Sequence, residues 1–388
     1  MWPDFAGGSI FNLMQGVIAA RGGRPLGPLP DGVDIRRWAD APTLVLLVLD
    51  GVGMAQLDLL PHTAFLRRHC TRTLTSVFPS TTATAITTFM TGCTPARHGV
   101  TGWHVRCEEV GDQVIAVLPV RPRGDIALGM TEDQALERLH PVDDVFSGLR
   151  LASSVISPAD IADSSFNRRH SRGAQRTAYR GGMIGLLQGL SGVLDAVPAP
   201  GYVYAYWPDF DHCAHHQGCR SDQAAALLAE ADAALEAWCE RWQGPPIQLV
   251  VTADHGFIDA AAERLLELEN FPALIDCLDG PLSGERRAVF CHVKSGRRRD
   301  FERALGDLSH ACTPWPIDDL LAARRFGDGP VHPRLRSRLG DWLLEMKDDW
   351  TLRDTLPGER PFRLIGVHGG SSAAEMRVPL IELCAGNR

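Results

Sequence analysis

Four apolar runs of strand length, set between segments of helical patterning, constrain the fold of this chain most strongly. The first run, TLVLLVLD, offers apolar side chains to both faces of a sheet, which is typical of a buried parallel strand. The four runs cover residues 43–50, 153–157, 202–207 and 247–254, and the helical patterns cover 55–68, 181–194 and 221–242. Strands that alternate with helices predict an α/β fold, with helices on both faces of a doubly wound, mostly parallel sheet.

Carboxylates and imidazoles gather at the ends of these runs. Asp50 and Asp254 end two of the runs, and Asp211 lies shortly after a third. Because ligands of open α/β sheets bind beyond the carboxyl ends of the strands, we expect these side chains to meet at one edge. His255 directly follows Asp254, and His215 lies one helical turn after Asp211. A buried Asp–His pair needs a partner, which is either a metal ion or a hydrogen bond within the pair.

Two further observations bear on a metal site. His368 lies in the turn GVHGG, where glycines let the backbone approach an ion closely, although a lone histidine is more often structural. His212 and His216 stand beside the Asp211 and His215 pair, so the side of the helix that faces the ion stays open.

The hydroxyls of Ser80, Thr81 and Thr82 follow Pro79 and begin a predicted helix. A helix N-terminus favours anions, and metal coordination can deprotonate a threonine hydroxyl. Taken alone, the cluster could equally be an N-capping run. Together with the acids and histidines, it indicates a two-metal hydrolase with a threonine nucleophile.

Charge and hydropathy exclude several classes of partner. The net charge is −8 and no long basic block exists, so we expect no nucleic acid as a bulk partner. No run approaches the roughly 18 apolar residues of a membrane helix, and the first residues lack the pattern of a secretion signal. We therefore expect a cytoplasmic protein without a membrane partner. The sequence does not indicate which oligomeric state the protein adopts.

The ten cysteines include no CxxC pair, and a chain of 388 residues does not need disulfides, so we expect mostly reduced thiols. Cys213 and Cys219 flank the Asp211 and His215 pair and are conceivable additional ligands. Neighbouring carboxylates disfavour thiolate in such a site.

Five strings in this order resemble the alkaline phosphatase superfamily, and within it the type I phosphodiesterase/nucleotide pyrophosphatase family. They are LVLDGVG around Asp50, FPSTTATA with TGCTPARHGVTGW between 78 and 103, the DxxxHxxG pattern at 211–218, TADHG at 252–256 and GVHGGSSAAEMRVPLI from 366. The resemblance spans 43–380 and implies an alkaline-phosphatase-like sheet and hydrolysis of a small phosphoester through a phospho-threonine intermediate.

The resemblance also implies two divalent ions, with zinc expected and manganese or iron as alternatives. One ion would be held by Asp211, His215 and His368, and the other by Asp50, Asp254 and His255 together with the oxygen of the nucleophile. Aligning Pro79 with the proline of the family's Pro-x-x-Thr places the nucleophile at Thr82, with Thr81 as the alternative.

One departure from the family concerns the substrate. Nucleotide-cleaving members carry an asparagine three residues after the nucleophile, where this chain has Ala85, so Thr84 or a backbone amide becomes the candidate donor. Phosphonoacetate hydrolases hold the carboxylate of their substrate with lysines, and this chain has no lysine before Lys294. Arg106 or Arg123 could replace them. The alternatives to a phosphodiesterase are therefore a phosphomonoesterase or phosphonate hydrolase, then a phosphomutase, and last a non-catalytic metal-binding protein.

The composition changes after the last predicted strand. Residues 260–361 are rich in arginine, aspartate, glycine and proline, which indicates an inserted α+β cap over a core made of 1–259 and 362–388. Arg286 and Arg287 in the cap are candidates to face the substrate.

Overall fold

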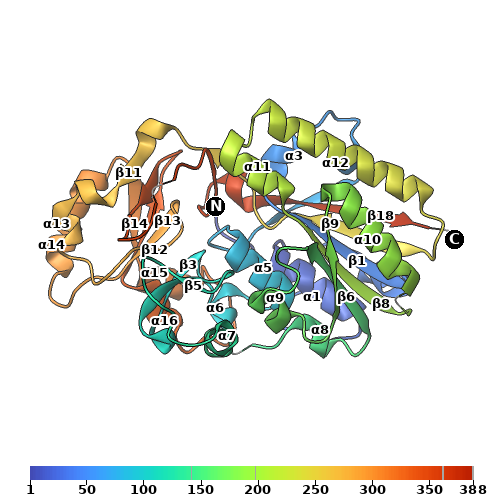
Figure 1. Ribbon diagram of the computed structural model, residues 1–388, viewed down its shortest axis with the longest axis horizontal. Coiled ribbons are helices and arrows are strands. Elements are labelled where there is room, and N and C mark those ends of the chain that lie inside the picture. The colour runs from blue at the N-terminus through green and yellow to red at the C-terminus, as the bar shows by residue number, and fades with distance from the viewer. Residues whose placement is uncertain (141, 197, 361, 387–388) are drawn as a thin grey trace.

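The computed structural model describes residues 1–140, 142–196, 198–360 and 362–386. Within this part of the chain, the larger sheet has the strand order β2-β18-β9-β1-β8-β6-β7 (Figure 1). Its strands are β1 (Thr43–Leu49), β2 (Cys70–Thr75), β6 (Ala152–Pro158), β7 (Gln175–Tyr179), β8 (Gly201–Trp207), β9 (Ile247–Thr252) and β18 (Arg377–Ala385). Strand β18 runs antiparallel to both of its neighbours, and the other pairs are parallel. The predicted mostly parallel sheet is confirmed.

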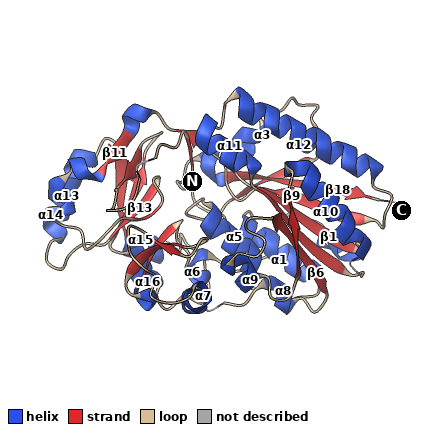
Figure 2. Cartoon of the chain, in the orientation of Figure 1, coloured by secondary structure: helices blue, strands red, loops and turns tan. Residues whose placement is uncertain are grey.

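Helices cover both faces of this sheet. In Figure 1, α12 (Asp222–Arg241) lies above the sheet, and α1 (Ile10–Ala20), α5 (Thr82–Thr91) and α9 (Ser165–His170) lie below it. Helix α10 (Gly182–Ala196) packs against α12 and against β6, β7 and β8. The same arrangement is visible in Figure 2 as helices on either side of the strands. The structure therefore confirms the doubly wound α/β architecture.

The centre of the sheet fixes the place of the acidic residues. All seven residues of β1 are buried, and β1 pairs in parallel with β8 and β9. Leu49 lies opposite Trp207, and Val48 lies opposite Thr252, so the three strands end at the same level. The residues that follow these strands are consequently delivered to one edge of the sheet.

One predicted helix is wrong. The pattern at 55–68 forms two short helices, α3 (Met54–Leu57) and α4 (Phe65–Arg68), instead of one. Pro61 lies between them, and its ring removes a backbone donor and disfavours a continuous helix.

The second large sheet has the strand order β14-β15-β13-β12-β3-β4-β5 and lies on the left of Figure 1. Its strands are β3 (His104–Cys107), β4 (Gln113–Ala116), β5 (Arg121–Pro122), β12 (Ser283–Gly284), β13 (Ala288–Cys291), β14 (Cys312–Pro316) and β15 (Trp342–Met346). Strands β3 to β5 lie outside the predicted cap at 260–361, and β3 pairs with β12, so this sheet joins segments that are far apart in the sequence. Residue 361, the predicted end of the cap, and 387–388 lie outside the described residues.

Shorter elements complete the chain. The remaining helices are α2 (Ile35–Asp40), α6 (Pro95–His98), α7 (Glu132–Leu139), α8 (Val145–Gly148), α11 (Asp209–Gln217), α13 (Pro272–Ile275), α14 (Arg298–Ala304), α15 (Ile317–Ala322), α16 (Leu335–Leu339) and α17 (Ala373–Met376). Two small sheets pair β10 (Ile258–Asp259) with β17 (Gly366–Val367) and β11 (Leu265–Glu267) with β16 (Thr351–Arg353). None of the helices in the described ranges combines the length and the apolar character that a bilayer crossing requires.

Candidate active site

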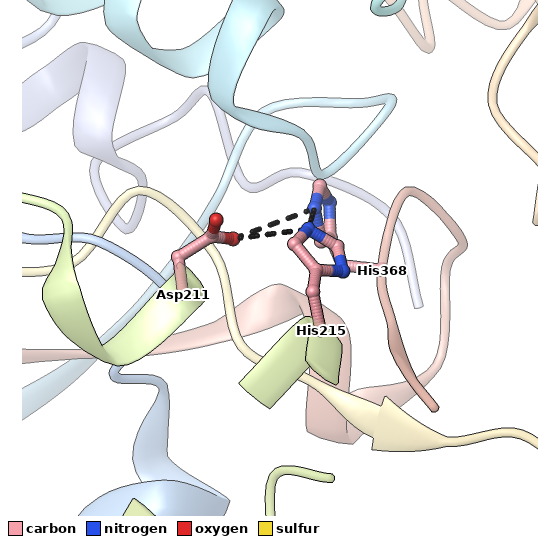
Figure 3. Close-up of side chains that lie close together, drawn as sticks. All are labelled: Asp211, His215 and His368. Atoms are coloured by element: carbon pink, nitrogen blue, oxygen red, sulfur yellow. Dashed lines mark hydrogen bonds and ion pairs between the residues drawn. The ribbon is translucent and has the colours of Figure 1, made fainter. Parts of the chain in front are cut away.

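The first Asp/His group joins two elements that are distant in sequence. Asp211 and His215 lie one turn apart on α11, and His368 follows β17 (Figure 3). The His215 Nε2 atom is 3.4 Å from Asp211 Oδ1, and His368 Nε2 is 3.7 Å from the same oxygen. The two Nε2 atoms are 3.3 Å apart. His212 and His216 are exposed on the same helix, so the structure resolves which side of the helix faces the site.

The second Asp/His group lies at the carboxyl ends of β1 and β9. The His255 Nε2 atom is 3.4 Å from Asp50 Oδ1 and 3.3 Å from Asp254 Oδ2. The side chains of all three residues are almost fully buried. Asp254 Oδ1 accepts hydrogen bonds from the backbone N–H groups of Gly51 and His255, at 3.0 and 2.9 Å. These bonds hold the carboxylate so that Oδ2 is directed at the imidazole.

All three histidines turn the same nitrogen toward the site. The Nδ1 atoms of His215, His255 and His368 lie next to backbone carbonyl oxygens, which only accept hydrogen bonds. The acceptors are Gly366, Gly256 and Ser80, at 2.9, 3.1 and 3.2 Å respectively. Nδ1 therefore carries the proton, and the lone pair of Nε2 is left for another partner.

The two Asp/His groups are adjacent. The rings of His255 and His368 stack with their centroids 3.7 Å apart. Each group holds three carboxylate or imidazole atoms, one from each residue, within 4.8 Å of one another. Two cation-sized sites consequently lie side by side.

Of the three clustered hydroxyls, Thr82 faces this pair of groups. Its Oγ1 atom lies 3.1 Å from His255 Nε2. Thr81 Oγ1 instead donates to Glu285 Oε1 at 2.6 Å, and Ser80 Oγ donates to the carbonyl of Gly370 at 2.6 Å. Thr82 is also the first residue of α5, a helix of ten residues whose N-terminus favours negative charge.

The chemistry of the donor set fits divalent cations. Asp50 Oδ1, Asp211 Oδ1 and Asp254 Oδ2 are buried without a hydrogen-bond partner among the described residues. Buried carboxylate oxygens normally have partners, because losing water is costly. Carboxylate oxygens combined with neutral imidazole nitrogens are ligands that zinc, manganese and iron accept.

The pKa shifts of the acids and histidines also favour a bound cation. Burial raises the pKa of Asp50 well above its usual value, and the neighbouring Asp211 and Asp254 raise it further. Burial also raises the pKa of Asp211 to about 7. Burial and the neighbouring His255 and His215 lower the pKa of His368 well below its usual value. Crowded acids beside neutral imidazoles form an environment that a cation would stabilise.

A cavity of about 550 Å³ opens over Thr82, Asp211 and His215. Arg123 and Arg286 are also in its wall, so they are placed where a substrate could reach them. Arg106, by contrast, is not in the wall and pairs with Asp112 and Asp279.

Two predicted substrate residues do not reach the cavity. Arg287 is 1% exposed and donates from Nε and Nη2 to the carboxylate of Glu375, at 3.2 and 3.0 Å. Its guanidinium therefore holds the fold together and is closed to a substrate. Thr84 is fully buried, and Ala85 beside it presents no side-chain donor.

The sequence did not single out two residues that touch the site. Tyr206, at the end of β8, donates its hydroxyl to Asp50 Oδ2. Glu285 accepts from Thr81 and also from the backbone N–H of Trp103, at 2.7 Å. The strand-end position of Tyr206 was an available signal, whereas nothing in the sequence marks Glu285. In the described chain, neither Cys213 nor Cys219 is part of an Asp/His group.

Comparisons with known proteins agree with this geometry. The model of the family "Type I phosphodiesterase / nucleotide pyrophosphatase" matches residues 44–116 and 148–371. No curated protein matches the sequence.

Among solved structures, human ectonucleotide pyrophosphatase/phosphodiesterase 5 is similar, with a TM-score of 0.64 and 17% identity over 87% of each chain. The mouse protein has a TM-score of 0.63 and 16% identity, over 89% of this chain and 88% of its own. It has also been solved as an inactive threonine-to-alanine variant in complex with AMP.

Phosphonoacetate hydrolase from Sinorhizobium meliloti 1021, in complex with phosphonoacetate, has a TM-score of 0.61 and 14% identity, over 88% of this chain and 89% of its own. The TM-scores show a shared fold, and the family match covers most of the chain. The chain belongs to the type I phosphodiesterase/nucleotide pyrophosphatase family, a family of phosphoester hydrolases that typically depends on divalent metals.

Proposed function

We propose that this protein hydrolyses a small phosphoester with two divalent ions and a covalent intermediate on Thr82. The observation that carries the proposal is the position of Thr82 Oγ1, 3.1 Å from His255 Nε2 and in the wall of the cavity. The unpartnered oxygens of the neighbouring carboxylates support the metal part of the proposal.

One ion would be held by Asp211, His215 and His368, and the other by Asp50, Asp254 and His255 with the oxygen of Thr82. When bound, such ions lower the pKa of a coordinated hydroxyl and stabilise negative charge on phosphoryl oxygens. Zinc is the metal that the family resemblance leads us to expect, and the same ligands also accept manganese or iron.

The chemistry assigned to Thr82 has two steps. In the first, its oxygen forms a bond to phosphorus and loses its proton to solvent, while the bond from phosphorus to the leaving oxygen breaks and that oxygen takes up a proton. In the second, a water oxygen bonds to phosphorus and the Thr82–phosphorus bond breaks, which restores the hydroxyl. The partial positive charge at the start of α5 favours the anionic phosphoryl group throughout.

A phosphodiester is the substrate class that we favour, because the cavity of about 550 Å³ extends beyond the Asp/His groups and has room for a second ester group. A phosphomonoester or phosphonate is the alternative. Ala85 supplies no side-chain donor, which weakens the case for a nucleotide substrate.

The test is a comparison of kcat/KM for a phosphodiester, a phosphomonoester and a phosphonate that share the 4-nitrophenolate leaving group. We expect the diester to react fastest. A higher value for either of the other two would reassign the substrate class, and no turnover of any of the three would overturn the hydrolase proposal.

A further inference from the structure

The cavity contains a guanidinium that no carboxylate neutralises by contact. Arg286 lies in the cavity wall, and its Nη2 atom donates to the carbonyl of Phe362 at 3.1 Å. Its Cζ atom lies 4.6 Å from the centre of the Phe362 ring. Within the described ranges, no Asp or Glu oxygen lies within 4.0 Å of its nitrogens. The stacked ring leaves other guanidinium donors available to a ligand.

A nearby arginine of the cavity wall is committed in a different way. Arg123 donates to Asp354 Oδ1 at 2.7 Å and to Glu359 Oε2 at 2.8 Å. Two carboxylates therefore neutralise Arg123, and its hydrogen bonds fix it in place. Arg286 has no carboxylate contact of this kind among the described residues. Its positive charge is therefore available to a substrate, whereas that of Arg123 is neutralised.

Arg353, a third arginine in the wall, pairs with Glu267 and donates to the carbonyl of Phe362. Burial lowers the pKa of Arg286 to about 10, and the nearby positive charge of Arg353 lowers it further. A half-buried cation that is crowded by another cation would be stabilised by a bound anion.

The chain places this cation in the wall of the same cavity as the reacting hydroxyl. Arg286 follows Glu285, whose carboxylate accepts from Thr81 at 2.6 Å, and Thr81 directly precedes Thr82. The turn between β12 and β13 is thus attached to the start of α5. A substrate that reaches Thr82 from the cavity passes through the space that Arg286 borders.

We propose that Arg286, backed by Phe362, is an anion subsite, and that the natural substrate is a phosphoester with a second anionic group, either a phosphoryl group or a carboxylate. The inference rests on the proposed function, since it assigns the reacting phosphoryl group to the Asp/His groups and the second anion to Arg286. A guanidinium fork recognises both kinds of anion by paired hydrogen bonds.

The test uses the full-length, metal-loaded enzyme and phosphodiesters of 4-nitrophenol whose second ester group is propyl, 2-carboxyethyl or 2-phosphonoethyl. A second series keeps the propyl group and places a carboxylate on the nitrophenol. The variants are Arg286→Gln, which removes the charge, and Arg286→Lys, which keeps the charge and loses the fork. Arg303→Gln is the matched control, because its side chain is 77% exposed on α14 of the same part of the chain.

We expect the wild-type enzyme to show a kcat/KM about tenfold or more higher for an anionic substrate than for the neutral one in at least one series. Arg286→Gln should remove that preference through KM, so that the ratio of kcat/KM for the anionic ester to kcat/KM for the propyl ester falls to about one, since a charged hydrogen bond is lost only with the anion. Arg286→Lys should keep part of the preference, and Arg303→Gln should keep all of it.

Equal wild-type rates for charged and neutral esters, or an Arg286→Gln variant that lowers all rates alike, would overturn the subsite while leaving hydrolysis intact. Failure of the wild-type enzyme on every ester would instead refute the proposed function, and the subsite with it. Whether the carboxyethyl or the phosphonoethyl ester reacts faster identifies the preferred anion.

Discussion

The hydroxyl oxygen of Thr82 lies 3.1 Å from Nε2 of His255, while the preceding hydroxyl, on Thr81, donates to Glu285 at 2.6 Å. Two adjacent and chemically identical side chains therefore have different surroundings. The hydroxyl of Thr82 faces the imidazole of His255, and the hydroxyl of Thr81 is occupied by a hydrogen bond to Glu285 in the turn between β12 and β13. The difference follows from the extended backbone of the N-cap residue Thr81 and the helical backbone of Thr82.

Metal content gives the first prediction. The purified protein should carry about two divalent ions per chain, and prolonged dialysis against a chelator should abolish activity, because the unpartnered carboxylate oxygens need a cation. His215→Ala should lower the content by about one ion, since it removes one of three ligands.

His212→Ala is the control on the same helix, because its side chain is exposed and should leave the content unchanged. The contents are measured by elemental analysis. Equal metal content in His215→Ala and the wild type would contradict the assignment of His215.

The buried ion pair of Arg287 and Glu375 gives the second prediction, which concerns stability. Arg287→Met should lower the free energy of unfolding by about 3–5 kcal/mol, because it leaves the Glu375 carboxylate buried without its charged partner. Arg303→Met, at an exposed position, should change it by about 0.5 kcal/mol or less. Urea denaturation followed by tryptophan fluorescence measures both. A small effect of Arg287→Met would show that the pair contributes little net stability.

The third prediction concerns how the stability of the folded protein depends on pH through Glu359. Burial acts to raise the pKa of Glu359, but hydrogen bonds from Arg123 and from the backbone amides of Leu356 and Gly124 lower it to about 2, against an ordinary value of 4.5. A depressed folded-state pKa stabilises the protein above the ordinary value, and this contribution disappears as the pH falls toward the folded value.

The wild type should therefore be more stable than Glu359→Gln near neutral pH, and the difference should shrink as the pH falls from about 4.5 toward 2. Unfolding free energies of both proteins across this range test the expectation. A difference that stays constant with pH would mean that Glu359 keeps its ordinary pKa in the folded protein.

Sequence patterns could predict the centre of the site because strand register determines it. Asp50 and Asp254 follow strands that pair in parallel, so their position at a common edge follows from the apolar runs alone. Asp211 and His215 follow from helical spacing. Local geometry was sufficient at each of these positions.

The cap could not be predicted in the same way. Arg286 and Arg287 are neighbours in the turn between β12 and β13, yet one lines the cavity and the other is buried against Glu375. Which one faces the cavity depends on the pairing of β12 with β3, a contact between segments some 180 residues apart, His104 with Gly284. The hydrogen bond of Glu285 to Thr81 depends on the same pairing.

The turnover number of Thr82→Ala, measured beside that of Thr81→Ala at equal metal content, tests whether Thr82 is the nucleophile. Removing a nucleophile leaves only the acceleration that comes from binding and electrostatics, so Thr82→Ala should lose about 10³-fold or more in kcat. Thr81→Ala loses a hydrogen bond to Glu285 and should stay within about tenfold of the wild type. A Thr82→Ala enzyme that turns over a phosphodiester at the wild-type rate would show that Thr82 is not the nucleophile.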